Sequence, residues 1–433
     1  MSVDGEKVEL NLTMYCLCVH VPDSRFPSVR MAIKDAEYML KSNDSTVILI
    51  WHDTIKDVDF FSSLLPWQIV NRIPNMNYLC RKAPYVYGVQ KIMPFFPGVF
   101  TFLPQSFVLP MQEAAFVEAF DSQNKKFIIK PDGGSFGRGI TILNPGQTYV
   151  PQKGLAVAQE YIESYLLDEK KFDFRIYVLI ASVTPLKIYI YRDGVARFCS
   201  EKYSANSVYS QLTNVALNKG RPGVDMAKIS QLISDVLPIM AARGVDVDLL
   251  WKKIDRAITL AVISSYGSLV RGERRRCPGK AYPRCFQMLG FDVLFDKNLN
   301  PWILEVNYRP SLKFYRGRER RMKVGMIKDV LRIACPLQAA QAALLARRWG
   351  WTEETWTTFV EENPDVLAAC KMSRKEAVKN SKFVKTFPPK EQENMIYHDI
   401  LKKVLELPED QIEDPELGKD GWKNRFEDVG PDN

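Results

Sequence analysis

The stretch FDVLFDKNLNPWILEVNYRPS, residues 291–311, predicts two β-strands joined by a turn. Apolar residues alternate along its first and last parts, and the middle is rich in Asp, Asn and Pro, which is the composition of a turn. Pairing the two strands as a hairpin places Phe295 opposite Trp302 on an apolar face that can be buried. We take this hairpin as the element around which the rest of the fold is arranged.

The other face of the hairpin is polar. In the same register Asp292 lies opposite Glu305, and Asn307 follows Glu305 by two residues. Two neighbouring carboxylates repel each other unless a cation lies between them, and oxygen ligands without His or Cys favour Mg²⁺, the partner of nucleotide phosphates. The alternative is a half-solvated hairpin whose acidic residues bind nothing. The segment alone leaves both interpretations open.

The composition is that of a globular protein with about two to three domains. The chain has 433 residues, of which 46% are hydrophobic and 25% are charged. No apolar run reaches the roughly 18 residues of a membrane span, and the N-terminus lacks the order of a signal peptide. We therefore expect a cytoplasmic protein that enters no membrane. Eight Cys without a CxxC pair, and only three His, argue against zinc and for reduced thiols.

The net charge is +8, with basic residues crowded into 271–284 and 309–332. Such an excess favours an anionic partner, although basic runs also occur as ordinary solvated faces. Nucleic acid is disfavoured as that partner, because the basic residues lack interleaved exposed aromatic residues and no base-reading module is visible.

The other segments predict a mixture of helices and strands. Residues 8–51 read as strand, helix and strand, which indicates an open α/β unit. Residues 172–199 predict a long antiparallel pair with its turn at Asp193-Gly194, since this dipeptide supplies the positive φ of a tight turn. From residue 316 onward the pattern is helical.

The loop KPDGGSFGRGI, residues 130–140, joins two predicted strands. Its four glycines let the backbone present N–H groups to an anion. Lys130 precedes the loop and a strand follows it, so the loop matches neither the Walker spacing nor the dinucleotide fingerprint. A flap over a phosphate chain is one interpretation, and a glycine-rich hairpin with a surface lysine is the alternative.

A strand with one charged face follows in the segment KFDFRIYV. Lys171, Asp173 and Arg175 share one face, and an apolar row shares the other. Lys suits a phosphate, Asp suits ribose hydroxyls, and Arg suits a carboxylate or a transferring phosphoryl group; a cross-strand row of ion pairs is the alternative. Combined with Lys130 and the polar hairpin face, this strand indicates an ATP-binding cleft between two α+β lobes, the ATP-grasp arrangement.

Five segments, in order along the chain, resemble motifs of the tubulin tyrosine ligase-like family. They are KPDGGSFGRGI, AQEYIESYLLDEKKFDFRIYVLI, YRDGVARFCSEKY, QLTNVALNK and CFQMLGFDVLFDKNLNPWILEVNYRPSL. VNRIPNMNYLCRK and FLPQSFVLP resemble its N-terminal segments. The likeness covers roughly residues 68–335.

The resemblance implies an ATP-grasp fold of class α/β (α+β) with four parts. These are an N-terminal α/β domain (1–110), a central ATP-grasp lobe (111–195), a C-terminal ATP-grasp lobe with the metal site (196–335) and a helical extension (336–433). It also implies a ligase. ATP phosphorylates a protein carboxylate, and the amino group of a free amino acid then attacks the acyl phosphate to form an amide bond.

Individual roles are carried over from the same motifs. The nucleotide-binding residues so implied are Lys130, Arg138, Gly139, Gln159, Glu160, Tyr161, Ile162, Lys171, Asp173, Thr213 and Asn214. As catalytic residues, Arg175 would stabilise charge on the acyl phosphate and Arg197 would hold the carboxylate of the incoming amino acid. Mg²⁺ would be bound by Asp292, Glu305 and Asn307.

The implied partner is tubulin, through its acidic C-terminal tail or within microtubules, and the implied cofactors are ATP and Mg²⁺. Glutamate is the expected amino acid, because the segments around CRK and KFDFRIYVL look more like the glutamylases and glycylases than the tyrosine-adding member; glycine is the alternative. We expect a monomer in the cytoplasm, on the cytoskeleton, with the cilium, flagellum or basal body as narrower locations.

The chain departs from the family pattern at three positions. Gln211 and Val215 stand where His and Tyr are usual, and Arg309 stands where many members have Ser. Gln cannot take up a proton at neutral pH, and Arg309 adds a cation near the expected metal. A non-catalytic microtubule-binding protein is therefore the alternative of a different class. The presence of every expected ATP and metal residue favours an active enzyme.

Overall fold

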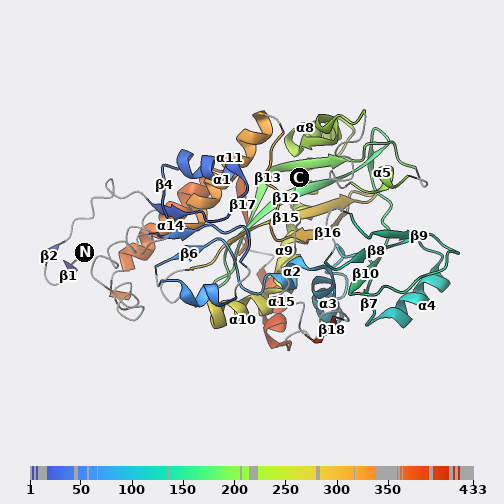
Figure 1. Ribbon diagram of the computed structural model, residues 1–433, viewed down its shortest axis with the longest axis horizontal. Helices are drawn as coiled ribbons and strands as arrows, with labels where there is room; N and C mark the ends of the chain where they lie inside the picture. The colour runs from blue at the N-terminus through green and yellow to red at the C-terminus, as the bar shows by residue number, and fades with distance from the viewer. Residues whose placement is uncertain are drawn as a thin grey trace.

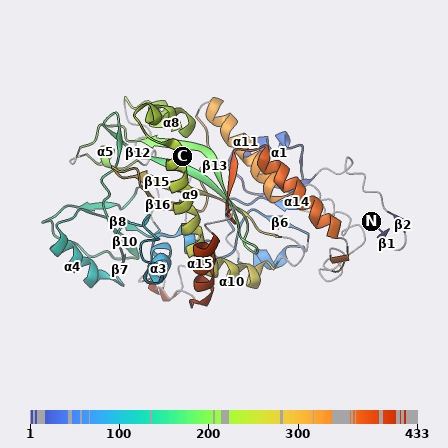
Figure 2. The same cartoon turned by 180° about the vertical axis from the view of Figure 1, so that it is seen from behind.

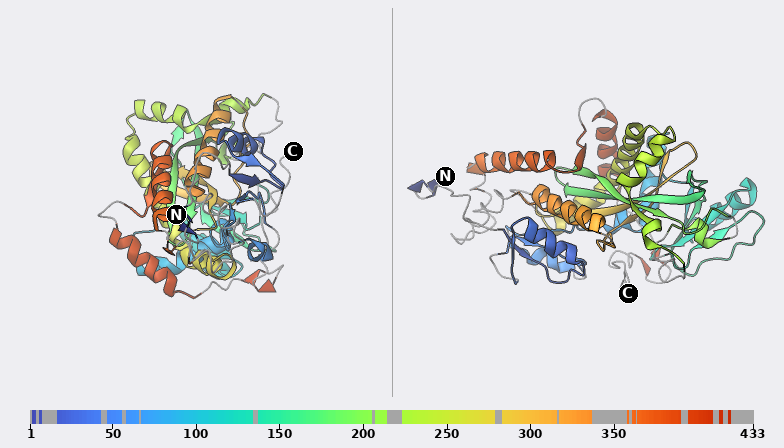
Figure 3. Two further views of the ribbon diagram at one scale, coloured as in Figure 1. Left: turned by 90° about the vertical axis from the view of Figure 1, so that its left-hand side faces the viewer. Right: turned by 90° about the horizontal axis from the view of Figure 1, so that it is seen from above.

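The computed structural model is a mixed α/β fold built on a central antiparallel sheet (Figure 1). The residues that the structure describes are 2–3, 6–7, 17–42, 47–55, 58–65, 67–133, 137–204, 207–213, 223–278, 283–315, 317–336, 358, 361–362, 364–389, 394–408, 413–414 and 418–419. The N-terminal α/β elements lie towards one end of the molecule and a smaller sheet lies at the other (Figures 1 and 3).

The central sheet has the strand order β14-β13-β12-β15-β16, and β17 also pairs with β13. Its strands are β12 (Lys170–Ser182), β13 (Lys187–Phe198), β14 (Ser230–Leu232), β15 (Gln287–Phe295), β16 (Pro301–Asn307) and β17 (Phe383–Phe387). A short strand, β11 (Leu166–Leu167), pairs with the start of β12. The ATP-grasp class expected from the sequence, α/β (α+β), is the class of this fold.

The central sheet is covered on both faces along most of its length. Even-numbered side chains of β12 pack in one core with α9 (Val247–Ser264), and Tyr177, Leu179 and Ala181 pack in a second core with α11 (Gly317–Ala334). Figure 2 shows α9 in front of the sheet. Because side chains alternate along a strand, the charged residues at the start of β12 lie on the α11 side, beyond the part of the sheet that α11 covers.

The hairpin predicted from residues 291–311 is present as β15 and β16. Asp292 pairs with Glu305 as expected. The expected register is wrong by one residue near the turn, where Phe295 pairs with Pro301. A bulge in β16 at Leu304 absorbs the difference. The sequence alone does not reveal a bulge, because one extra residue changes the pairing without changing the composition.

The turn expected at Asp193-Gly194 is also wrong. Both residues lie inside β13, and the turn between β12 and β13 is formed by residues 183–186. A Cβ on Gly194 would lie 2.3 Å from the carbonyl oxygen of Arg175. The glycine is therefore required for the close approach of two strands and not for a positive φ.

The smaller sheet has the order β7-β10-β8-β9, with antiparallel neighbours. Its strands are β7 (Ser106–Leu109), β8 (Phe127–Pro131), β9 (Thr141–Leu143) and β10 (Ala156–Glu160). The helix α4 (Glu113–Gln123) covers one face, with Phe116 and Phe120 packed against Phe127. The opposite face is left for the cleft described below.

The N-terminal sheet confirms the open α/β unit. Its strands run parallel in the order β4-β3-β5-β6. The elements are β3 (Cys18–His20), α1 (Pro27–Asp35), β4 (Met39–Leu40), β5 (Leu49–Ile50) and β6 (Ile69–Val70). Pro27 begins α1 and fixes the φ of its first residue. The buried residues of α1 belong to the same core as α11.

The remaining described helices surround these sheets. They are α2 (Asn77–Cys80), α3 (Lys82–Ile92), α5 (Val208–Gln211), α7 (Met226–Ile229), α8 (Ile233–Ala242), α10 (Tyr266–Arg276), α14 (Pro364–Lys379) and α15 (Asn394–Glu406), with 3₁₀ turns at Val58–Ser63 and Met93–Phe95. No helix in the described part of the chain has the length and apolar content needed to cross a lipid bilayer.

The C-terminal region contains helices, as expected, and one strand that the sequence analysis did not predict. β17 joins the edge of the central sheet beside β13, so the expectation of an entirely helical pattern after residue 316 is wrong there. Two isolated two-residue pairs, β1 (Ser2–Val3) with β2 (Glu6–Lys7) and β18 (Glu413–Asp414) with β19 (Gly418–Lys419), lie near the chain ends. The domain boundaries at 110, 195 and 335 stay a prediction.

Candidate active site

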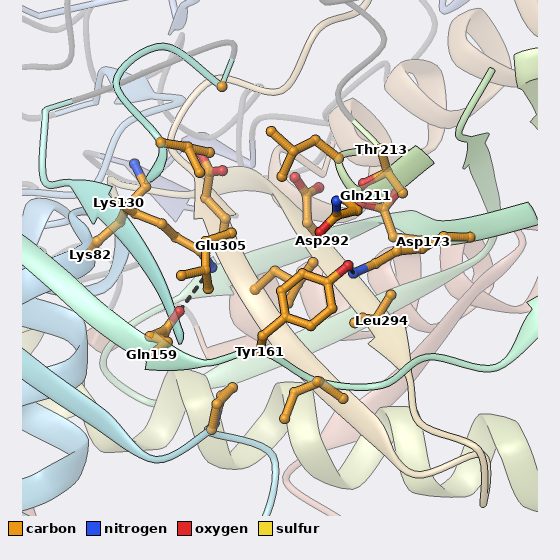
Figure 4. Close-up of a pocket in the computed structure, with 18 of the residues that line it drawn as sticks. Lys82, Lys130, Gln159, Tyr161, Asp173, Gln211, Thr213, Asp292, Leu294 and Glu305 are labelled. Carbon is orange, nitrogen blue, oxygen red and sulfur yellow. Dashed lines mark hydrogen bonds between the residues drawn. The ribbon is translucent and has the colours of Figure 1, made fainter. Parts of the chain in front are cut away.

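A cleft lies between the smaller sheet and the charged end of the central sheet (Figure 4). The predicted site residues that line it are Lys130, Arg138, Gln159, Glu160, Tyr161, Ile162, Lys171, Asp173, Arg197, Thr213, Asp292 and Glu305. They come from distant parts of the chain. Pairing of β12 with β13 and β15, and closure by the smaller sheet, bring them together.

Four predicted residues have other positions. Arg175 on β12 and Asn307 on β16 lie next to the cleft and are not part of its lining. Gly139 lies in the glycine-rich loop 130–140, which we call the flap, between the lining residues Arg138 and Ile140. Gly139 has a φ of +69° and packs against Pro131. Asn214 lies outside the described residues.

Several residues that line the cleft have no role predicted from the sequence. Lys82, at the start of α3, contributes a second lysine at one end, and its signal was the CRK motif of the N-terminal segment. Ile128, Leu212 and Leu294 contribute apolar surface. Isolated apolar residues carry no sequence signal of this kind, because the same residues serve in any core.

Arginine and aspartate side chains form a connected cluster on the floor of the cleft. Arg197 binds both oxygens of Asp173, with Nε–Oδ1 at 2.7 Å and Nη2–Oδ2 at 2.6 Å, and its Nη2 lies 2.8 Å from Oδ2 of Asp292. Arg175 binds Asp292 from the other side, with Nε–Oδ1 at 2.5 Å and Nη2–Oδ2 at 3.1 Å. Thr213 donates to Asp173 at 2.6 Å.

Strand pairing explains this cluster. Asp173 is the direct neighbour of Arg197 on β13, and Arg175 is the direct neighbour of Asp292 on β15. Burial raises the pKa of Asp292, but the two arginines outweigh burial and lower that pKa to about 2. Asp173 and Arg175 therefore form the cross-strand ion pairs of the alternative interpretation, and Lys171 and Asp173 line the cleft. Binding of a ligand by this row stays a prediction.

Two buried lysines line the cleft, Lys130 from β8 of the smaller sheet and Lys171 from β12, next to Asp173 on the same face. Lys130 donates to Gln159 Oε1 at 2.8 Å, and Lys171 donates to the hydroxyl of Tyr161 at 2.9 Å. Burial lowers the pKa of each lysine to about 8; for Lys130 the carboxylate of Glu305 opposes this shift. Both ammonium groups therefore stay charged at neutral pH but lie close to losing their proton.

Tyr161 directly follows β10 and lies between the ammonium groups of two lysines. The ammonium groups of Lys126 and Lys171 lie 4.3 and 4.1 Å from the centre of its ring, which is the geometry of a cation–π contact. Tyr161 also packs with Ile128 and Leu212 in a small apolar cluster. An apolar pocket beside main-chain groups of β10 suits a flat heterocycle.

Gln211, one of the departures from the family pattern, lies in this part of the cleft. Its Oε1 accepts a hydrogen bond from Lys126 at 2.6 Å. The contact connects α5 with the segment that leads into β8. Gln211 therefore contributes to closing the cleft, a role that needs an acceptor and no titration.

The residues expected to bind Mg²⁺ offer oxygen donors of the kind that the ion prefers. Asp292 and Glu305 are direct neighbours across β15 and β16. Within the described residues the side chain of Glu305 makes no hydrogen bond or ion pair, whereas the carboxylate of Asp292 is bound by both arginines. The side-chain nitrogen of Asn307 donates a hydrogen bond to Gly290 O at 3.3 Å. The oxygen Oδ1 of Asn307 is therefore left to act as a metal ligand.

This oxygen set fits Mg²⁺, with a competition at Asp292. A cation at Asp292 would compete with Arg175 and Arg197 for the carboxylate oxygens. In the described part of the chain there is no cluster of three or more His, Cys, Asp or Glu residues. Two carboxylates with one amide, completed by phosphate oxygens and water, is a common environment for this ion.

Arg309 is directed towards the N-terminal sheet. Its Nη1 donates to Thr54 Oγ1 at 3.0 Å, and the charges that surround it include Asp53, Arg25 and Arg72. Burial lowers the pKa of Arg309, but it remains a cation. The residue therefore links the end of β16 to the carboxyl edge of the N-terminal sheet.

Comparison with known proteins places this site in a family. The model of the tubulin-tyrosine ligase family matches residues 61–343. The chain is 32% identical over 362 residues to a probable beta-tubulin polyglutamylase of Tetrahymena thermophila, covering 77% of this chain and 30% of that protein. It is 30% identical over 338 residues to tubulin polyglutamylase TTLL7 of Homo sapiens, covering 73% of this chain and 38% of that protein.

A third relative, tubulin polyglutamylase TTLL11 of Homo sapiens, is 33% identical over 329 residues, covering 67% of this chain and 46% of that protein. The chain thus spans less than half the length of these three relatives. The family model covers the smaller sheet and the central sheet from β11 to β16, including the β15–β16 hairpin, but not β17. On this match over most of its length, the chain belongs to the tubulin-tyrosine ligase family.

Proposed function

We propose that the protein is an ATP-dependent ligase that adds glutamate to a glutamate side chain of tubulin, a tubulin polyglutamylase. The observation that carries this proposal is the convergence of Lys130, Lys171, Asp173, Arg197 and Glu305 on one cleft. Family membership supports ligase chemistry. The printed names of the relatives support glutamate over glycine as the added amino acid.

The cleft offers a place for each part of ATP. The apolar cluster around Tyr161, with the main chain from Gln159 to Ile162, suits the adenine. The carboxylate of Asp173 suits the ribose hydroxyls, from which it would accept hydrogen bonds in addition to those from Arg197. Lys171 lies beside Asp173. Lys130 and the flap residue Arg138 suit the phosphates, because buried or flexible cations bind anions strongly in a site of low dielectric.

The acidic residues of the hairpin would hold Mg²⁺ at the phosphate end. The ligands would be Asp292, Glu305 and Asn307, and bound Mg²⁺ neutralises negative charge on phosphate oxygens. Of the two carboxylate ligands, only Glu305 has a side chain that no other described residue binds.

The chemistry has two steps, and this chain contributes cations and orientation to both. In the first, an oxygen of the acceptor carboxylate attacks the γ-phosphorus of ATP, which gives an acyl phosphate and ADP. In the second, the amine of free glutamate attacks the acyl carbon, phosphate leaves with the bonding electrons, and the amine loses a proton. Arg175 and Arg197 provide positive charge beside the reacting carboxylate and the amino acid.

The remaining proposals concern partners and place. The acceptor would be the acidic tail of tubulin, free or in microtubules, which the net charge of +8 attracts. We further propose a monomer that works in the cytoplasm on the cytoskeleton, with the cilium, flagellum or basal body as narrower locations.

One assay tests the function. Purified protein is incubated with tubulin, ATP, Mg²⁺ and labelled glutamate or labelled glycine, and incorporation into tubulin is measured. We expect label from glutamate. Incorporation of glycine alone would contradict the proposed donor and identify a glycylase.

A non-catalytic microtubule-binding protein is the competing function. The sequence features that favour it are Gln211, Val215, Arg309 and the basic run Lys313, Arg316, Arg318, Arg320, Arg321 and Lys323. A thermal-shift titration with Mg²⁺ and ATP separates the two, because a ligand that binds only the folded state raises the melting temperature. Microtubule binding without any shift at millimolar nucleotide would support the competing function.

A further inference from the structure

A row of buried polar side chains crosses the smaller sheet below the cleft. Ser106, Gln159 and Lys130 lie on the adjacent strands β7, β10 and β8, and each is at most 8% exposed. Gln159 pairs directly with Ser106, and Lys130 pairs with Val157, which places Lys130 on the diagonal from Gln159. Such positions share one face of a sheet, so the register of three strands brings the three polar groups together.

The hydrogen bonds along this row run in one direction. Ser106 Oγ donates to Pro104 O at 2.6 Å, Gln159 Nε2 donates to Ser106 Oγ at 2.9 Å, and Lys130 Nζ donates to Gln159 Oε1 at 2.8 Å (Figure 4 shows the last). A hydroxyl has one proton, and the carbonyl of Pro104 can only accept it. Ser106 therefore accepts from the amide nitrogen of Gln159, and the amide oxygen is fixed towards Lys130.

The main chain of the row is also held in place. Gln90 Nε2, from α3, donates to the main-chain oxygen of Ser106 at 2.7 Å. In turn Gln112 Nε2 donates to Gln90 Oε1 at 3.2 Å. The strand that carries Ser106 is thereby tied to the helix that begins at Lys82, another residue of the cleft.

We propose that Ser106 and Gln159 are positioning residues, which fix Lys130 as a charged donor directed at a phosphate group of the nucleotide. The inference rests on the proposed function, in which Lys130 binds ATP. The oxygen of Gln159 takes one of the three ammonium protons and leaves two for a phosphate, and a neutral amide does not cancel the lysine charge. A reversed amide would place two donors against each other.

The electrostatics of Lys130 make this orientation important. Burial lowers the pKa of Lys130 to about 8; the charge of Lys82 adds to this shift, and the carboxylates of Glu305 and Asp292 oppose it. An acceptor at hydrogen-bond distance favours the charged form, so loss of a fixed Gln159 oxygen lowers that pKa further. A carboxylate in the same place would raise the pKa but would neutralise the charge that a phosphate needs.

The test is the affinity of the full chain for a non-hydrolysable ATP analogue with Mg²⁺, measured by calorimetry from about pH 6.5 to about pH 9.5. Ser106→Ala frees the amide of Gln159. We expect about tenfold weaker binding at neutral pH, the effect of one hydrogen bond to a charged group. We also expect the loss of binding at alkaline pH to begin at a lower pH than in the wild type.

Two matched variants make the test specific. Ser106→Thr keeps the hydroxyl, so affinity and pH profile are expected to stay as in the wild type. Gln159→Glu is expected to bind the analogue more weakly at neutral pH and to move the alkaline loss to a higher pH. If Ser106→Ala does not fold, as judged by thermal unfolding without nucleotide, these two variants decide the question.

The outcomes separate this inference from the proposed function. Equal affinity and an unchanged pH profile in Ser106→Ala and Gln159→Glu would overturn the inference. A loss that is the same at every pH and is not restored by Ser106→Thr would also overturn it, since it would mark a structural role. Failure of the wild type itself to bind nucleotide would refute the proposed function, and the inference with it.

Discussion

Arg197 and Asp173 form a two-point ion pair on neighbouring strands of the central sheet, and Arg197 also contacts Asp292. The side chain of Asp173 is 1% exposed and that of Arg197 is 11% exposed. Two acidic side chains from separate strands are thus held by one guanidinium. Both residues line the cleft.

Replacement of Arg197 by leucine should destabilise the protein, because it leaves the buried Asp173 without its cation. We expect Arg197→Leu to lower the free energy of unfolding by about 3 kcal/mol, measured by urea denaturation. The control is Arg243→Leu, whose ion pair with Asp168 is exposed and should change stability by less than about 1 kcal/mol. Equal effects of the two variants would show that the buried pair contributes no more than a surface pair.

Nucleotide affinity should fall as pH rises through about 8, the pKa to which burial lowers Lys130 and Lys171. Each lysine loses its charge there and with it the attraction for phosphate. Lys171→Arg keeps a charge at high pH, so log Kd should rise with pH about half as steeply as in the wild type. Calorimetric titrations across this range check the slopes; the same slope in both proteins would exclude Lys171 as a ligand of the nucleotide.

The same two lysines give the opposite trend in stability without nucleotide. The folded protein loses their protons near pH 8, whereas the unfolded chain keeps them up to about pH 10.4. Between these values the unfolded state binds more protons, so the contribution of the lysines to the free energy of unfolding rises with pH. Urea denaturation of Lys171→Met should show a smaller rise than the wild type, and an identical rise would contradict the lowered pKa.

Removing the charge of Glu305 should uncouple nucleotide binding from Mg²⁺. We expect addition of Mg²⁺ to tighten ATP-analogue binding in the wild type and to change it little in Glu305→Gln. Glutamate incorporation should fall about 100-fold or more. Glu163→Gln is the control, because that carboxylate is exposed and pairs with Lys297 at the surface. An unchanged Mg²⁺ effect in Glu305→Gln would remove Glu305 from the metal site.

A side chain at Gly194 should push apart the strands that carry Arg175 and Arg197. The Cβ of Gly194→Ala would lie 2.3 Å from Arg175 O and 2.9 Å from Ile233 Cδ1. Such overpacking costs about 1–3 kcal/mol, and we expect a loss of that size in urea denaturation. Gly325→Ala is the matched control in α11, where an added Cβ meets nothing within 4 Å. Helix propensity should there give a neutral result or a gain of up to about 1 kcal/mol.

The sequence by itself determined which side chains share a face. Period-two alternation placed the charged residues at the start of β12 on one side and Phe172, Phe174 and Ile176 on the other, and the structure has them so. The same rule placed Asp292 on one face of its strand, and Glu305 and Asn307 on one face of theirs. Alternation depends only on the local geometry of a strand, so it can be read from neighbouring residues.

Only the tertiary structure decided which strands are neighbours and in what register. The pairing of Asp173 with Arg197, the position of the β12–β13 turn and the addition of β17 to the sheet all depend on contacts between distant segments. So does the row from Ser106 through Gln159 to Lys130, since Ser106 and Gln159 are 53 residues apart. Register and sheet order are set by the packing of the whole core, and no short stretch of sequence contains that information.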